Sequence, residues 1–162
     1  ERSFLFTGDA ETPAETRLTE EYGSGLESAV YLGGHHGSAT SSTGPFLDAV
    51  DPEIAMLSSA YDSQYGHPAD ETLARLSERS IATYWTGIHG TTVFESDGEV
   101  ITVSTQVNAT TDPSDLKAAP QATAGVTDET VKRAVYTFES ENGSTSLVAG
   151  PVVGPEQRAS GI

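Results

Sequence analysis

The chain has 162 residues, and its 24 acidic against 8 basic side chains give a net charge of -16 at pH 7. It contains no cysteine, which excludes disulfide bonds, thiolate metal ligands and cysteine nucleophiles. No run approaches the ~20 consecutive apolar residues of a transmembrane helix, and the length suits one domain with a tail.

The acidic residues are scattered along the chain, whereas lysine occurs only at Lys117 and Lys132. Dispersed acid with so little lysine is typical of a surface that stays hydrated in concentrated salt, so we expect a halophilic source, with an ordinary acidic protein as the alternative. This surface repels nucleic acid at low ionic strength, but at molar salt the Debye length is only about 3 Å and the repulsion fades.

The chain starts without methionine, and its first residues lack the basic and apolar zones of a signal peptide. We therefore expect it to be a piece of a longer protein. Its location, cytoplasmic or extracytoplasmic, stays open.

The first predicted elements are a strand at 3–7, a helix at 12–21 and a strand at 29–32. The first strand ends at Gly8 and Asp9, which puts a carboxylate at a sheet edge, where ligands of α/β layers gather. This order is typical of a β-α-β unit, although periodicity alone does not tell whether the strands are parallel.

The second strand runs into Gly33-Gly34-His35-His36-Gly37-Ser38, which holds two of the four histidines. Glycine permits positive φ and lets a ligand approach the backbone closely. Neutral imidazole is the commonest side chain offered to a transition metal. This stretch is therefore the first candidate for a polar site.

The later elements alternate in the same way. We predict a helix at 45–50, a strand at 54–59, a helix at 70–76, a strand at 81–85, and a hairpin with strands at 91–95 and 99–104. We take residues 1–107 as one domain, 108–130 as a linker because no apolar period survives there, and 131–162 as a tail that contains a hairpin.

Five polar residues follow the predicted strands, directly or within a few positions: Asp9, His35, His36, His67 and His89. In a layered sheet these side chains can meet at one edge, and carboxylate with imidazole suits zinc, manganese or iron. Taken singly, His67 and His89 are more simply read as surface histidines in glycine turns. An adjacent pair held between glycines is harder to explain in that way.

Four separated motifs also resemble a known family. They are Phe6-Thr7-Gly8-Asp9-Ala10-Glu11, Gly34-His35-His36-Gly37-Ser38 with Thr40-Ser41-Ser42 behind it, residues 46–55, and Tyr65-Gly66-His67-Pro68. In order and spacing they are similar to the C-terminal half of the metallo-β-lactamase-fold domain of ComEC-type competence proteins and their soluble relatives, over about residues 3–104. The resemblance implies an α/β fold, half of an αββα sandwich, with a β-rich C-terminal tail.

The resemblance further implies a dinuclear metal site, of zinc or manganese, at one edge of the sheets. Asp9 is similar to the carboxylate that bridges both metals, and one histidine of the pair completes a metal's shell; His35 is favoured, with His36 close behind. His67 lies in a motif that resembles a substrate-edge loop, which makes it the catalytic candidate, for phosphate contact or proton donation. We expect His89 to be a solvated turn histidine.

The family's first metal-binding motif should precede Asp9, and this sequence lacks it. We therefore expect an incomplete metal site, with the missing N-terminal half of the domain as partner and no activity in this fragment alone. In the complete protein the resemblance implies hydrolysis of a DNA phosphodiester during uptake in competence, with another ester or an amide as the less favoured alternative substrate. The alternative is a non-catalytic association module, whose exposed strand edge pairs with another chain or in a homodimer.

Overall fold

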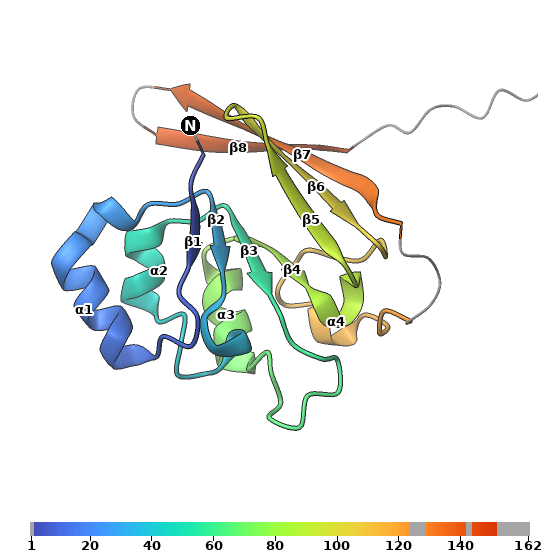
Figure 1. The fold of residues 1–162 in the computed structure, drawn as a ribbon, viewed down its shortest axis with the longest axis horizontal. Helices are drawn as coiled ribbons and strands as arrows, with labels where there is room; N and C mark the ends of the chain where they lie inside the picture. The colour runs from blue at the N-terminus through green and yellow to red at the C-terminus, as the bar shows by residue number, and fades with distance from the viewer. Residues whose placement is uncertain (1, 124–128, 142–143, 152–162) are drawn as a thin grey trace, which may run out of the picture.

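Figure 1 shows a computed structural model of the chain, which describes residues 2–123, 129–141 and 144–151. The described strands form two four-stranded sheets. The first holds β1 (Phe4–Phe6), β2 (Val30–Leu32), β3 (Ile54–Leu57) and β4 (Ala82–Trp85), and the second holds β5 (Thr92–Ser96), β6 (Val100–Thr105), β7 (Val131–Glu141) and β8 (Ser144–Pro151). The first sheet is parallel and the second antiparallel, so the fold is mixed α/β.

The first three helices connect the parallel strands, and the fourth leads from β4 to β5. They are α1 (Thr12–Tyr22), α2 (Gly44–Val50), α3 (Asp70–Glu78) and the short α4 (Thr86–His89), with 3-10 turns η1 (Gly23–Leu26), η2 (Gly34–Gly37) and η3 (Leu116–Ala118). Each predicted strand and helix of residues 3–104 is thereby confirmed to within a few residues. In the described part of the chain no helix is long and apolar enough to cross a membrane.

The parallel strands pair in their sequence order and in step with one another. Phe4 pairs with Val30, Val30 with Ile54, and Ile54 with Ala82, so the four strands begin level. β3 is buried along its whole length, as expected for a parallel strand covered on both faces. Because the strands start level and are three or four residues long, their carboxyl ends meet at one edge.

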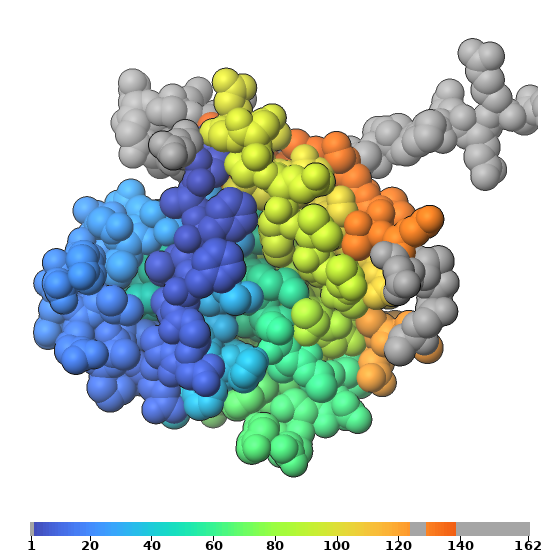
Figure 2. All heavy atoms as spheres, in the orientation of Figure 1, coloured from blue at the N-terminus to red at the C-terminus, as the bar shows by residue number. Residues whose placement is uncertain are grey.

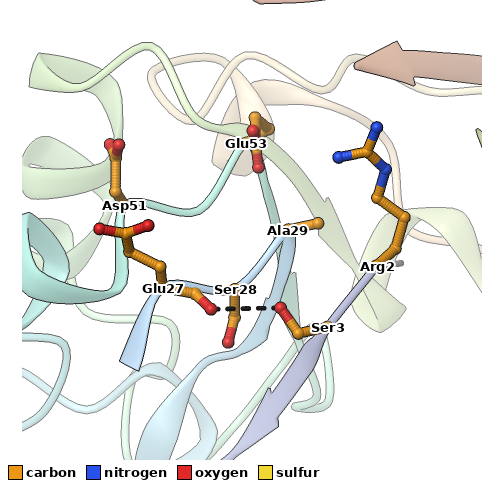
Figure 3. Close-up of a pocket in the computed structure, with 7 residues that line it drawn as sticks. All are labelled: Arg2, Ser3, Glu27, Ser28, Ala29, Asp51 and Glu53. Atoms are coloured by element: carbon orange, nitrogen blue, oxygen red, sulfur yellow. Dashed lines mark hydrogen bonds between the residues drawn. The ribbon is translucent and has the colours of Figure 1, made fainter. Parts of the chain in front are cut away.

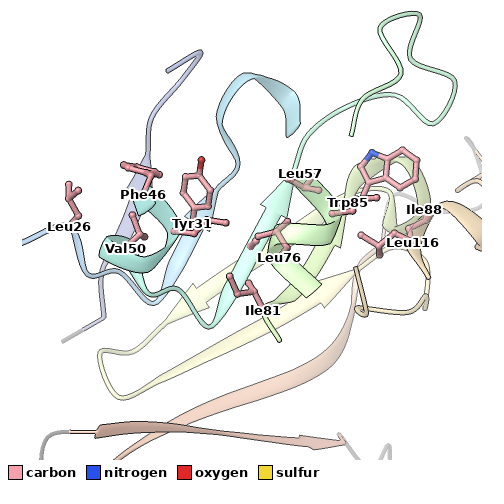
Figure 4. Packing of buried hydrophobic residues seen from close by; sticks show 13 residues of the cluster. Leu26, Tyr31, Phe46, Val50, Leu57, Leu76, Ile81, Trp85, Ile88 and Leu116 are labelled. Atoms are coloured by element: carbon pink, nitrogen blue, oxygen red, sulfur yellow. The ribbon is translucent and has the colours of Figure 1, made fainter. Parts of the chain in front are cut away.

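One hydrophobic core lies between the parallel sheet and the helices (Figure 4). Phe46 and Val50 of α2 and Leu76 of α3 pack there against Tyr31 and Leu57 of the sheet. The ring of Tyr31 meets that of Phe46 edge to face, with centroids 5.8 Å apart. The helices therefore cover one face of the parallel sheet.

A second core lies between the two sheets. It contains Ile54 and Tyr84 from the parallel sheet and Ile101 and Tyr136 from the antiparallel one. The hydroxyls of Tyr84 and Tyr136 are 2.7 Å apart and share a hydrogen bond, and burial raises the pKa of both tyrosines. The sheets thus pack face to face, which gives three layers: helices, parallel sheet and antiparallel sheet.

Residues 108–123, where we predicted a linker, pack against the domain. Leu116 is fully buried in the first core, Tyr61 donates a hydrogen bond from its hydroxyl to the carbonyl of Ala119 (3.1 Å), and the backbone N–H of Ala122 donates to Gly87 (2.9 Å). The apolar period is missing because isolated side chains and backbone hydrogen bonds fix this segment.

The predicted C-terminal hairpin continues the second sheet. β7 pairs with β6 on one side and with β8 on the other. Residues 142 and 143 of its turn, and the tail at 152–162, lie outside the described residues.

The side chain of Glu15 ties α1 to the loop that follows the histidine pair. It is fully buried, and its carboxylate accepts backbone hydrogen bonds from Ser42 (2.6 Å) and Thr43 (2.9 Å). A buried carboxylate is tolerated when such donors satisfy it.

We expect Glu15→Ala to lower the free energy of unfolding by about 3 kcal/mol, because two buried N–H groups lose a charged acceptor. Glu20→Ala, on the exposed face of the same helix, is the matched control and should change it by no more than about 0.5 kcal/mol. Urea unfolding in concentrated salt measures both. Equal losses in the two variants would show that the Glu15 contacts contribute nothing.

Candidate metal and substrate site

Polar groups follow all four parallel strands at the shared carboxyl edge. Asp9 follows β1, the histidine pair of η2 follows β2, Ser58 follows β3, and Thr86 follows β4. In open parallel sheets, ligands bind in the crevice outside these strand ends. The structure therefore puts the predicted polar residues where a ligand site is expected.

The backbone is left-handed at both histidines of the pair. φ is 47° at His35 and 57° at His36, and Gly37 continues with 81°. Such conformations are uncommon for residues with a side chain and gather at functional sites. Hydrogen bonds hold this turn: the N–H of His35 donates to the carbonyl of Gly8 (3.0 Å), and the carbonyl of His35 accepts from the N–H of Ser38 (3.0 Å).

Three imidazoles lie together at this edge. The ring centroids of His35 and His67 are 5.9 Å apart, and those of His35 and His36 are 6.4 Å apart. The Nδ1 atom of His36 is 2.8 Å from the carbonyl oxygen of Ser58. Because a carbonyl only accepts, Nδ1 donates the proton there, which leaves the Nε2 lone pair of a neutral His36 free for a ligand.

Glu11 adds a carboxylate to the histidine cluster. Its Oε1 atom lies 3.1 Å from Nδ1 of His35 and accepts a hydrogen bond from the hydroxyl of Thr40 at 3.1 Å. The contact with His35 is within ion-pair distance, although its angle falls outside hydrogen-bond geometry. Glu11 belongs to the first sequence motif, but its place beside His35 depends on how two turns meet.

His67 joins the cluster from the loop between β3 and α3. Its Nδ1 atom is buried and has no hydrogen-bond partner among the described residues. Burial lowers the pKa of His67, and the charges of His35 and His36 lower it further. The imidazole of His67 is therefore neutral at pH 7, and it can accept a proton.

Asp9 lies on the turn between β1 and α1. It is exposed and lines a hollow of about 470 Å³ with Ala10, Glu11 and residues of α1. No three histidine, aspartate or glutamate side chains of the described residues are grouped closely enough to hold one metal ion. The structure thus gathers His35, His36 and His67, and leaves Asp9 on the neighbouring turn.

The prediction for His89 is wrong. Its side chain is only 1% exposed, its Nδ1 accepts a hydrogen bond from the backbone N–H of Trp85 (3.0 Å), and its ring lies 5.1 Å from that of Tyr84. The glycines on either side suggested a solvated turn. The short helix α4 instead folds the imidazole inward, against Tyr84.

Two further hollows lie at the ends of the parallel strands. One, of about 480 Å³, is lined by Ser58, Tyr61 and Thr86 and so adjoins the residue that contacts His36. The other, of about 190 Å³, lies at the opposite edge, at the strand starts, between Arg2 and three carboxylates (Figure 3). The nearer hollow extends the histidine site, whereas the distant one is separate from it.

Comparison with known proteins gives three curated relatives. The chain is 42% identical over 92 residues to Competence protein ComA of Neisseria gonorrhoeae, which covers 57% of this chain and 13% of that protein. It is 30% identical over 102 residues to ComE operon protein 3 of Bacillus subtilis (strain 168), which covers 63% and 13%. It is 32% identical over 73 residues to Uncharacterized protein YcaI of Escherichia coli (strain K12), which covers 45% and 10%.

These likenesses support a competence-related family. The matched stretch spans no more than 13% of any of these three relatives. No protein-family profile matches the chain, and no solved structure matches it.

Gly37→Ala tests how tightly the histidine turn is packed. A Cβ at Gly37 would lie 2.9 Å from Cβ of Pro68, next to His67, whereas a Cβ at Gly98 would meet nothing within 4 Å. Both glycines have positive φ, so each substitution should cost about 1 kcal/mol of unfolding free energy from backbone strain. Gly37→Ala should cost about 1–3 kcal/mol more from the clash, and equal losses in urea unfolding would contradict it.

Stability should fall with acid because of His89. Burial, and to a smaller degree the charge of Arg133, lower the pKa of His89. Below its ordinary value of about 6.5 the unfolded chain binds a proton that the folded chain does not, so the unfolding free energy decreases as the pH falls toward the lowered pKa. His89→Gln should flatten this dependence in unfolding measured from pH 8 to pH 5. Identical slopes would contradict the prediction.

Proposed function

We propose that this chain is the C-terminal part of a metal-dependent hydrolase of the metallo-β-lactamase superfamily, which cleaves phosphodiester bonds of DNA during uptake in competence. The cluster of His35, His36 and His67 at the carboxyl edge carries this proposal. Similarity to Competence protein ComA and to ComE operon protein 3 supports the biological setting. Helices over a parallel sheet that packs on a second sheet are compatible with half of an αββα sandwich.

The donors present suit zinc or manganese in kind, because the Nε2 atom of His36 is free and carboxylates stand nearby. In this proposal Asp9, His35 and His36 hold the metal, as part of a dinuclear site. Since no three donors of the described residues are grouped, the other ligands come from another part of the parent protein. When bound, the metal lowers the pKa of a water molecule and polarises a phosphoryl oxygen.

The chain's own residues hold the site in shape and move a proton. The carbonyl of Ser58 fixes the tautomer of His36, and Glu11 lies beside His35. The roles expected for His67 were phosphate contact and proton donation. Because its lowered pKa keeps it neutral at pH 7, acceptance of a proton suits it better than either of these. In this proposal the proton moves within the cluster, because the ring centroids of His67 and His35 are 5.9 Å apart.

The second candidate function, a non-catalytic association module, is favoured by the free edge of the parallel sheet. In the described sheet β1 pairs only with β2, and Phe6 on this edge strand is 68% exposed. An edge strand with an exposed aromatic side chain can pair with another chain or with a second copy.

Metal content separates the two candidates. We expect the full chain, in concentrated salt with excess zinc or manganese, to bind a metal ion through its partial set of ligands, and His36→Ala or Asp9→Ala to weaken that binding. His89→Gln removes a buried histidine away from the site and should retain the metal. Plasma mass spectrometry after gel filtration gives the readout. A wild-type chain that binds no metal but forms a dimer in ultracentrifugation would favour the association module.

A further inference from the structure

Tyr65 is the most exposed large apolar side chain of the described residues, at 74%. It lies in the loop between β3 and α3, which projects beyond the carboxyl edge of the parallel sheet and forms the lowest part of Figures 1 and 2. A single exposed apolar residue is ordinary on a protein surface. Its position next to the histidine cluster makes this one informative.

The ring of Tyr65 contacts the histidine cluster through His67. It stacks on the ring of His67, with centroids 6.0 Å apart and an angle of 25° between the planes, and His67 in turn lies 5.9 Å from His35. The loop turn is closed by a hydrogen bond from the N–H of Gly66 to the carbonyl of Ser63 (2.9 Å). Three rings therefore run from solvent to the histidine cluster, with Tyr65 outermost.

The negative charge of the protein limits the ligands that could bind at this ring. Most DNA-binding proteins depend on basic side chains that contact phosphates, but this chain carries a net charge of -16. Arg75, behind the histidine pair, already donates to the carbonyls of Ala39 and Ser41, and Arg17 shares its hollow with two carboxylates. Attraction to phosphates is therefore weak here.

Stacking of a base on an aromatic ring needs no charge and tolerates any sequence, because every base has a π-face. It also persists in the concentrated salt that screens charges. In a duplex the bases are stacked on one another and cannot reach a side chain without unpairing. An exposed ring beside this site thus selects unpaired bases.

We propose that Tyr65 is a stacking platform for a base of single-stranded DNA, which places the neighbouring phosphodiester beside His67 and His35. The identity of the substrate rests on the proposed function. The binding step itself requires neither metal nor cleavage. His67 then has a second role, as the ring that supports the platform from within.

The test is fluorescence anisotropy of a labelled oligothymidylate with the full chain, in molar salt with a chelator. We expect the wild type to bind this strand more tightly than an abasic strand of the same length or a duplex. Tyr65→Ala should weaken binding of the oligothymidylate about tenfold and leave the abasic strand nearly unchanged, a loss in the range known for single stacked bases. Tyr65→Phe keeps the ring and should bind like the wild type.

Tyr22→Ala is the matched control, because Tyr22 is also exposed but lies at the end of α1. The platform is overturned if Tyr65→Ala binds as tightly as the wild type, if Tyr22→Ala loses as much, or if the wild type shows no preference for the base-bearing strand. Because the assay contains no metal, a Tyr65-dependent preference in a chain that retains no metal would uphold the stacking proposal and leave the proposed metal site without support. A chain that retains the metal but shows no Tyr65-dependent preference would support the metal site and contradict the stacking proposal.

Discussion

Level pairing of four parallel strands is the constraint on which the rest of the molecule depends. Phe6, Leu32, Met56 and Tyr84 form one row across the sheet, so the residues that follow each of them emerge at the same edge. A shift of one strand by one residue would also turn its side chains from one core to the other. The two cores on opposite faces therefore fix the register, and the register brings the histidine turns together.

The few basic side chains of the protein mainly stabilise its fold. Arg75 of α3 donates to backbone carbonyls of the loop between the histidine pair and α2, and Arg79, just after α3, donates to the carbonyl of Gly44 at the start of α2. Arg2 lies over the ring of Phe138, 4.0 Å from its centroid, and links the first residues to the antiparallel sheet. In this strongly acidic protein these arginines thus stabilise the fold, while imidazoles and an aromatic ring lie at the candidate site.

Much of this arrangement is predictable from sequence, because short apolar runs that end in glycine mark both the strands and their polar ends. The parallel direction was not, since periodicity does not report it. His89 was misjudged because its burial depends on Trp85 and Tyr84, which meet it only in the fold. The contact of Glu11 with His35 joins two turns and leaves no local pattern. The metal ligands and the role of His67 remain predictions.

The hydrogen bond between Tyr84 and Tyr136 constrains how the two sheets align. Aliphatic side chains between two sheets pack almost equally well in several alignments, whereas a hydroxyl pair has only one. Sliding the antiparallel sheet across the parallel one would leave two buried hydroxyls without their hydrogen bond in an apolar layer, which costs free energy of folding. The Tyr84–Tyr136 pair therefore favours one alignment of the two sheets among the several that apolar contacts alone would permit.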